Sequence, residues 1–158
     1  MYELIPLPGH TYDMVGFRAF GDVVYLADCL SGRETTEKYR VNFLVNVGDY
    51  LATLEKVKAM EAACFVPAHA KATDDIAELA QFNIDTVHAV AGDICRICRE
   101  PVGFDQLLKA LFDEYGLVMT AEQHALVGST VRSYLTWLQE EGRIAAEFAE
   151  NMQYYRSV

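Results

Sequence analysis

Positive charge, paired cysteines and long apolar runs are all scarce in this sequence of 158 residues, and each shortage excludes a class of protein. Lysine and arginine number 13 against 23 aspartate and glutamate, which gives a formal net charge of −10. Non-specific attraction to nucleic acid or to an anionic membrane is therefore not expected. No apolar run approaches the roughly 20 residues that span a bilayer. The N-terminus carries no basic leader followed by an apolar segment. These features predict a cytoplasmic protein without a membrane partner.

The four cysteines are too few and too scattered for a disulfide scaffold, so we expect reduced thiols. Cys95 and Cys98 form a C-x-x-C pair inside a predicted helix, with no second pair in the chain. This context favours structural thiols over a redox or metal site. Cys29 follows Asp28, but neighbouring side chains on an extended backbone point in opposite directions. The two residues are therefore not expected to share a metal.

Hydrophobic residues make up 52% of the chain and aromatic residues 11%, which is ample for a packed core. The first hundred residues alternate between strand and helix patterns, which is typical of an α/β (α+β) fold. Strands are predicted at residues 2–7, 14–17, 23–27 and 63–66, helices at 49–60 and 73–99, and a loop at 31–36. Phe43 and Val45 are also expected to supply strand residues.

Two histidines and an aspartate lie where predicted strands end. His10 follows Pro8 and Gly9, Asp28 ends the third strand, and His69 comes just beyond the fourth. Chemistry in α/β proteins gathers at such positions. Imidazole and carboxylate groups are ligands for a metal such as zinc. From the pattern alone, a histidine that follows a strand is more often a polar loop or turn residue than a ligand, so both interpretations of His10 stay open at this point.

The amino-acid sequences of three short segments favour the metal interpretation. "PLPGHTYDMVG", "VVYLADCL" and "FVPAHA" occur in this order, and together they resemble the third, fourth and fifth metal motifs of the metallo-β-lactamase superfamily, which includes glyoxalase II. The resemblance covers roughly residues 2–100. It implies that His10 binds the first metal ion, that Asp28 bridges, and that His69 binds the second, with zinc as the expected cofactor.

The sequence also departs from this family. The H-x-H-x-D-H signature is absent, because no two of the four histidines lie two residues apart. The family fold is an αββα sandwich of two similar halves, and this chain resembles the second half, with a strand-like beginning that fits a truncated protein. The resemblance implies a fragment of a metal-dependent hydrolase. We expect no hydrolysis from this chain alone and partial or absent zinc, because most ligands of the dinuclear site are missing. Thioester, lactone, β-lactam and phosphodiester substrates all remain open.

Residues 101–158 form a second predicted domain after the first at 1–100. An apolar stripe at helical spacing is closed by Gly116, and a second helical stretch is followed by an alternating segment with a turn at Glu150 and Asn151. Helix, helix and hairpin in this order are typical of a small winged-helix domain. Four basic residues against eight acidic ones argue against DNA binding. The predicted role of this tail is packing or protein interaction.

Two functional hypotheses follow, together with one on assembly. The alternative to the hydrolase fragment is a non-catalytic protein-interaction or nucleic-acid-binding module that uses the winged helix. A lone half-sandwich exposes the apolar face of its sheet. We therefore predict a homodimer through that face, or a missing N-terminal half that covers it. His88 and His124 lie on helical stretches without a ligand partner and are expected to be solvent-facing or packed in the core.

Overall fold

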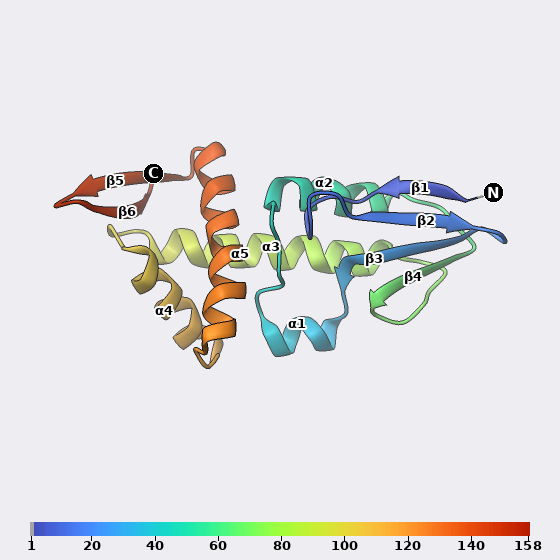
Figure 1. The fold of residues 1–158 in the computed structure, drawn as a ribbon, viewed down its shortest axis with the longest axis horizontal. Coiled ribbons are helices and arrows are strands. Elements are labelled where there is room, and N and C mark those ends of the chain that lie inside the picture. Colours follow the sequence, from blue (N-terminus) through green and yellow to red (C-terminus); the bar gives the residue numbers. More distant parts are fainter. Residues whose placement is uncertain (1) are drawn as a thin grey trace. The chain divides into compact units, whose positions relative to one another are not determined.

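The computed structural model describes residues 2–158 and divides the chain into two compact units. One unit runs up to Val87 and the other is His88–Val158. Helix α3 (Ala77–Ile97) supplies residues to both units, because the boundary along the chain falls within this helix (Figure 1). The sequence-based domain boundary at residue 100 stays a prediction, and each unit is described here by itself.

The first unit contains a mixed four-stranded sheet with the order β1-β2-β3-β4. Strands β1, β2 and β3 pair antiparallel, whereas β3 and β4 pair parallel. The elements of this unit, besides the start of α3, are β1 (Glu3–Pro6), β2 (Val15–Ala19), β3 (Val23–Ser31), α1 (Arg33–Tyr39), α2 (Val47–Lys58) and β4 (Cys64–His69).

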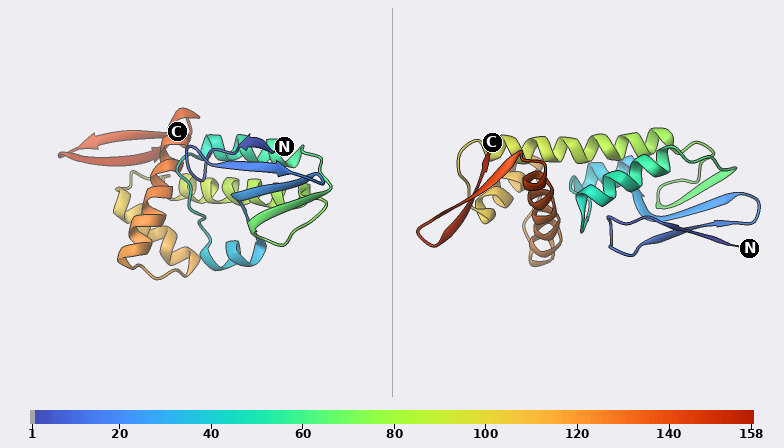
Figure 2. Two further views of the ribbon diagram at one scale, coloured as in Figure 1. Left: turned by 45° about the vertical axis from the view of Figure 1, so that its right-hand side comes forward. Right: turned by 90° about the horizontal axis from the view of Figure 1, so that it is seen from above.

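One face of this sheet is buried against helices. Figure 2 shows α2 and the first part of α3 on the same side of the four strands. The strand residues buried on this side are Ile5, Val24, Leu26 and Phe65, and Leu7 directly after β1 is buried as well. The helices add Tyr50, Leu54, Val57, Ile84 and Val87. Apolar residues alternate along these strands because every second side chain points into the core.

Several predicted boundaries in this unit are wrong. Strand β3 continues to Ser31 and β4 runs through Pro67 to His69, because the two strands pair with each other beyond their predicted ends. Residues 31–36 are not a loop, since helix α1 begins at Arg33. Phe43 and Val45 lie between α1 and α2 and not in a strand.

The second unit follows the sequence pattern closely. Helices α4 (Phe104–Tyr115) and α5 (Ala121–Glu140) precede a hairpin of β5 (Ile144–Ala149) and β6 (Met152–Ser157). Gly116 ends α4 in the left-handed conformation, with φ 65°. Glu150 and Asn151 both have positive φ, 52° and 63°, as a tight hairpin turn requires. The helices, the glycine and the turn are confirmed, and the winged-helix assignment of this order stays a prediction.

The core of the second unit is built from the predicted apolar stripes. Its buried residues include Leu107, Leu108, Leu111, Phe112, Val127, Val131, Leu135, Leu138, Ile144 and Tyr155. Val102 pairs with Tyr155 of β6, which ties the start of this segment to the hairpin. Within residues 2–158, none of the helices has the length and apolar character that crossing a membrane demands.

Candidate functional site

The loop that carries His10 is held by the start of α2. The carbonyl of Gly9 accepts hydrogen bonds from the backbone N–H groups of Val45 and Asn46, at 2.9 and 3.1 Å. Gly9 has φ +125°, and a Cβ atom there would lie 2.4 Å from the Cα atom of Tyr50. Only glycine fits this backbone and this close approach. The position of His10 is thereby fixed from its N-terminal side.

Two further contacts fix the same loop. The hydroxyl of Thr53 on α2 donates to the carbonyl of Pro8 at 2.7 Å. The ring of His10 meets the ring of Phe43 edge-on, with centroids 5.4 Å apart and planes at 78°. Both the backbone and the imidazole are therefore restrained before any ligand arrives.

Asp28 is placed by an irregularity in β3. The parallel pairing with β4 shifts register on both sides of Ala27, which has φ +47°. A non-glycine residue in this left-handed region is strained, and such strain concentrates at functional sites. The bulge breaks the in–out alternation, so Asp28 is partly exposed while Cys29 is fully buried.

The backbone of His69 is held by the segment that follows β3. Ser31 pairs with His69 in the β3–β4 register. The N–H of Gly32 donates to the carbonyl of His69 at 3.0 Å, and a Cβ atom at Gly32 would lie 2.7 Å from that oxygen. The imidazole of His69 lies at the exposed end of the strand.

The three predicted site residues come together at this edge of the sheet. The Nε2 atom of His69 lies 3.2 Å from Oδ1 of Asp28, and the Nε2 atom of His10 lies 3.8 Å from Oδ2 of the same carboxylate. Each imidazole therefore faces a different oxygen, with Asp28 between them. Their role as metal ligands stays a prediction.

The donor chemistry of this cluster fits zinc only in part. Two ligands of one tetrahedral zinc ion lie about 3.3 Å apart, since each sits about 2.0–2.1 Å from the metal. The His–Asp separations of 3.2 and 3.8 Å are close to this value. However, no group of three or more histidine, cysteine, aspartate or glutamate side chains in the described residues 2–158 is arranged to hold a metal ion. Each imidazole has one carboxylate oxygen beside it, which makes two donors.

The thiol of Cys29 is unsuited to this site. Its side chain is fully buried, and burial, followed by the charge of Asp28, raises the pKa of the thiol to about 12. A thiol binds metal as the thiolate. Cys29 therefore serves as a small apolar core residue beneath the cluster.

Sequence reasoning missed Asn83, a buried residue of α3 that secures the end of β3. Its side-chain amide donates to the carbonyls of Ser31 and Leu79, each at 2.9 Å, and its oxygen accepts from the Ser31 N–H at 3.0 Å. The same oxygen accepts from the hydroxyl of Tyr50 at 3.3 Å. One side chain thus satisfies both backbone groups of Ser31 in the way that a neighbouring strand would.

This amide links the segments that carry the cluster. Ser31 lies three residues after Asp28 and pairs with His69, while Tyr50 lies against Gly9 beside His10. A signal for Asn83 does exist in the sequence, because a polar residue interrupts the apolar face of a predicted helix at that position. Buried polar groups of this kind are hydrogen-bonded, and their partners are often distant in sequence.

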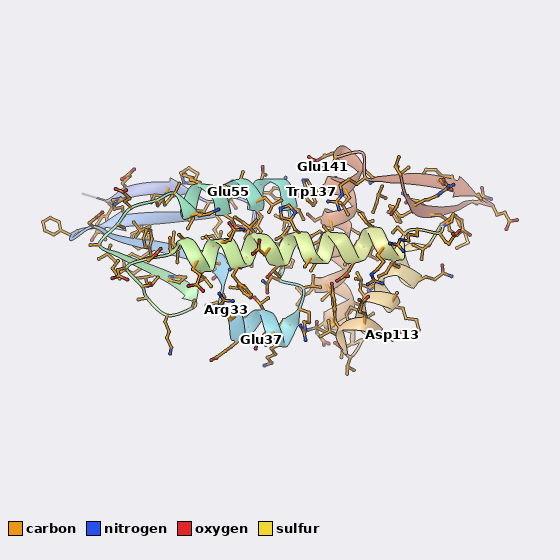
Figure 3. The ribbon with its side chains drawn as sticks, turned by 180° about the vertical axis from the view of Figure 1, so that it is seen from behind. Arg33, Glu37, Glu55, Asp113, Trp137 and Glu141 are labelled. Carbon is orange, nitrogen blue, oxygen red and sulfur yellow. The ribbon has the colours of Figure 1, made fainter. Side chains whose placement is uncertain are left out.

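A cleft of about 420 Å³ opens beside His69. Its wall includes Gly32, Arg33, Glu34, Thr35, Lys71, Thr73, Asp75, Glu78 and Leu79. Arg33 lies at the start of α1 (Figure 3). Its guanidinium binds Glu78 at 2.8 Å and lies 4.4 Å from the ring centroid of Phe82 on α3. The volume suits a small molecule or a short segment of one.

The remaining histidines and the C-x-x-C pair belong to the second unit. The ring of His88 lies 6.1 Å from that of Trp137, and Nε2 of His124 lies 3.9 Å from a carboxylate oxygen of Asp105. Cys98 is buried, and burial together with Cys95 raises the pKa of its thiol to about 12. Cys98 therefore has the character of a core residue, whereas Cys95 is half-buried.

Comparison with known proteins shows the fold. No family model matches the sequence, and no curated protein matches it. A metallo-beta-lactamase family protein from Thermus thermophilus matches with a TM-score of 0.78 and 16% identity, over 99% of this chain and 49% of that one. A beta-lactamase domain protein from Burkholderia ambifaria matches with a TM-score of 0.77 and 13% identity, over 99% of this chain and 48% of that one. The chain therefore has a metallo-β-lactamase-like α/β fold and spans about half the length of these solved proteins.

Proposed function

We propose that this chain is the C-terminal part of a metal-dependent hydrolase of the metallo-β-lactamase superfamily, with His10, Asp28 and His69 as zinc ligands. The observation that carries the proposal is the Asp28 carboxylate between two imidazoles, each facing its own oxygen. The fold shared with solved proteins of twice the length supports it. Imidazole and carboxylate groups are ligands that zinc takes, so His10, Asp28 and His69 would contribute to holding it.

The residues of this chain would bind and orient, and the metal would supply the nucleophile. Zinc bound by imidazole and carboxylate lowers the pKa of a bound water toward neutrality. His10 presents its nitrogen from a loop fixed by Gly9 and α2, so little ordering is needed when a ligand binds. His69 lies beside the 420 Å³ cleft, which would hold the group to be hydrolysed next to the metal.

The chain alone is not competent for hydrolysis under this proposal. Each imidazole shares one carboxylate, which gives two protein donors at each metal position. Zinc sites take about four ligands, and catalytic sites use three from the protein and one water. The missing donors would have to come from additional protein, so we expect low metal affinity and no hydrolysis from this chain alone.

Metal titration by calorimetry, followed by elemental analysis after dialysis, tests this proposal. We expect weak zinc binding and partial occupancy, both abolished by Asp28→Asn, which keeps the shape of the side chain and removes its charge. His124→Ala is the matched control, because that histidine also faces a carboxylate, at 3.9 Å, in the second unit. Two tightly held zinc ions per chain would contradict the incomplete site. Zinc binding that survives Asp28→Asn would contradict the ligand set.

A further inference from the structure

The face of the sheet that points away from α2 and α3 carries a continuous apolar stripe. Leu4 lies opposite Phe17, Phe17 opposite Tyr25, and Tyr25 opposite Val66, so one side chain from each of the four strands joins the row. Residues paired directly across strands point to the same face. This row of Leu4, Phe17, Tyr25 and Val66 is called the apolar stripe below.

The side chains of the stripe are packed against one another yet open to solvent. The rings of Phe17 and Tyr25 stack at 4.6 Å, and Tyr2 meets Phe17 edge-on at 6.2 Å. Leu4 is 69% exposed and Tyr2 is 73% exposed, and Val15 on β2 widens the patch. Aromatic side chains that are ordered before binding lose little conformational entropy when a partner covers them.

We infer that the apolar stripe is a self-association surface, and that a second copy of this chain covers it through a two-fold axis. The stripe contains no charged residue, so it offers nothing that would select a basic or acidic partner. The chain as a whole has a net charge of −10, so two copies repel each other least when they meet through an uncharged surface. An uncharged row of alternating aromatic and aliphatic side chains is complementary to itself, as an isologous contact requires.

The available area agrees with a dimer. Tyr2, Leu4, Val15, Phe17 and Tyr25 leave roughly 500 Å² of side-chain surface exposed, taking about 150–250 Å² for a whole aromatic side chain. A patch of this size is at the upper end of what soluble monomers expose. Two such patches give about 1,000 Å², slightly below the roughly 1,200 Å² at which stable interfaces begin, so the dimer is expected to be weak. Face-to-face packing of two sheets about 10 Å apart would bury both stripes.

The inference concerns this chain by itself, without the additional protein that the proposed function calls for. It does not depend on the metal, so it is tested in the presence of EDTA. Sedimentation equilibrium of the full chain at micromolar concentration should give twice the monomer mass of 17.7 kDa. Leu4→Glu should weaken the dimer at least about 100-fold, because every dimer would bury two unpaired carboxylates. Tyr25→Lys is the second variant, with circular dichroism to confirm that both proteins fold.

Two exposed phenylalanines outside the stripe serve as matched controls. Phe20 is 92% exposed at the β2–β3 turn, and Phe148 is 76% exposed on the hairpin of the second unit. Phe20→Glu and Phe148→Glu should leave the dimer unchanged within about threefold. Higher salt should tighten the dimer, because it screens the repulsion between two acidic chains while the stripe itself carries no charge.

Several outcomes would overturn the inference. A monomeric wild type that binds an apolar dye would mean that the stripe is open but that a second copy does not cover it. A monomer that binds no dye would mean that the chain covers the stripe itself. A dimer that Phe148→Glu disrupts, or that salt weakens, would place the interface elsewhere.

Discussion

The two sheets of this protein differ in the regularity of their strand pairing, and the irregular sheet is the one that carries candidate site residues. The hairpin β5–β6 pairs every residue from Ile144 to Ala149 with a partner and has no register shift. The β3–β4 pairing has two shifts, around a left-handed Ala27. The irregular sheet holds Asp28 and His69, and the loop between its strands β1 and β2 holds His10, while the regular hairpin holds no cluster of this kind. Local distortion marks the region in which side chains are placed for chemistry and not for packing alone.

The two units also differ in what holds them together. In the first unit the buried polar side chains Thr53 and Asn83 make hydrogen bonds to the loop before His10 and to the end of β3. In the second unit the core is mostly leucine, valine and aromatic residues. A buried polar network specifies position, whereas apolar packing mainly supplies stability.

The largest expected effect of a substitution is a loss of stability in the second unit. Leu111 is fully buried, and Leu111→Ala should lower the free energy of unfolding by about 2–5 kcal/mol through lost burial and a residual cavity. Trp137 is the only tryptophan in the chain and lies on α5, so its fluorescence during urea unfolding reports on this unit (Figure 3). A change below about 1 kcal/mol would contradict the packed core. Limited proteolysis that cuts throughout residues 102–158 would do so as well.

A smaller loss of stability is expected in the first unit, together with a local effect at the end of β3. Asn83→Ala leaves both backbone groups of Ser31 unsatisfied and removes one hydrogen bond from Tyr50, which should cost about 2–3 kcal/mol. Hydrogen exchange should show faster exchange of the Ser31 and Gly32 amides, and zinc binding should fall with it.

The matched control lies one turn along the same helix. Thr86 donates to the carbonyl of Phe82, and Thr86→Val removes this bond without touching β3. We expect unchanged exchange at Ser31 in Thr86→Val. If both variants weaken zinc binding equally, Asn83 has a general structural role and does not position the cluster.

The smallest expected effect is a loss of stability at alkaline pH, mainly in the second unit. Burial raises the pKa of the Cys98 thiol to about 12 and keeps the pKa of Tyr134 above its ordinary value, while burial and the bond to Asp93 do the same for Tyr115. These acids stay protonated in the folded chain but ionise at their ordinary pKa in the unfolded chain. Their stabilisation is therefore complete below about pH 9 and decreases as the pH rises further.

Urea unfolding followed by Trp137 fluorescence between about pH 7.5 and 10 measures this decrease. Cys98→Ala should make the stability curve flatter above about pH 9, since one of the raised groups is gone. Cys29 is the corresponding group of the first unit, with its pKa also raised to about 12. A stability curve that rises between about pH 9 and 10 would contradict the sign of the effect.

The second unit could be predicted from the sequence because its signals are local. The stripe that contains Leu107 and Leu111 lies on one helix, and Gly116 ends that helix directly after Tyr115. The turn at Glu150 and Asn151 lies between two alternating strands. Each of these features depends on neighbours within a few residues, where periodicity and turn chemistry are informative.

The first unit could be predicted in outline but not in its irregular parts. The three site residues were identified from the amino acids of three short motifs, because these carry information that the spacing of the residues alone does not. The left-handed Ala27 has no sequence signal, because alanine does not favour positive φ. Helix α1 follows a glycine and contains two adjacent threonines, which favour a loop by propensity, and its first residue is held by Glu78, far along the chain. Tertiary contacts overrode local preference at both places.

The parallel pairing of β3 with β4 also governs how the chain reaches this structure. Val23 must find Cys64 across a loop of about forty residues, whereas the β5–β6 hairpin closes over two. Long-range pairings of this kind slow folding, because chain entropy is lost before contacts compensate for it. We therefore expect the hairpin and its two helices to form early, and the strand edges of the other sheet to stay open for longest. In a crowded cell, that interval is when the apolar stripe is most exposed to aggregation.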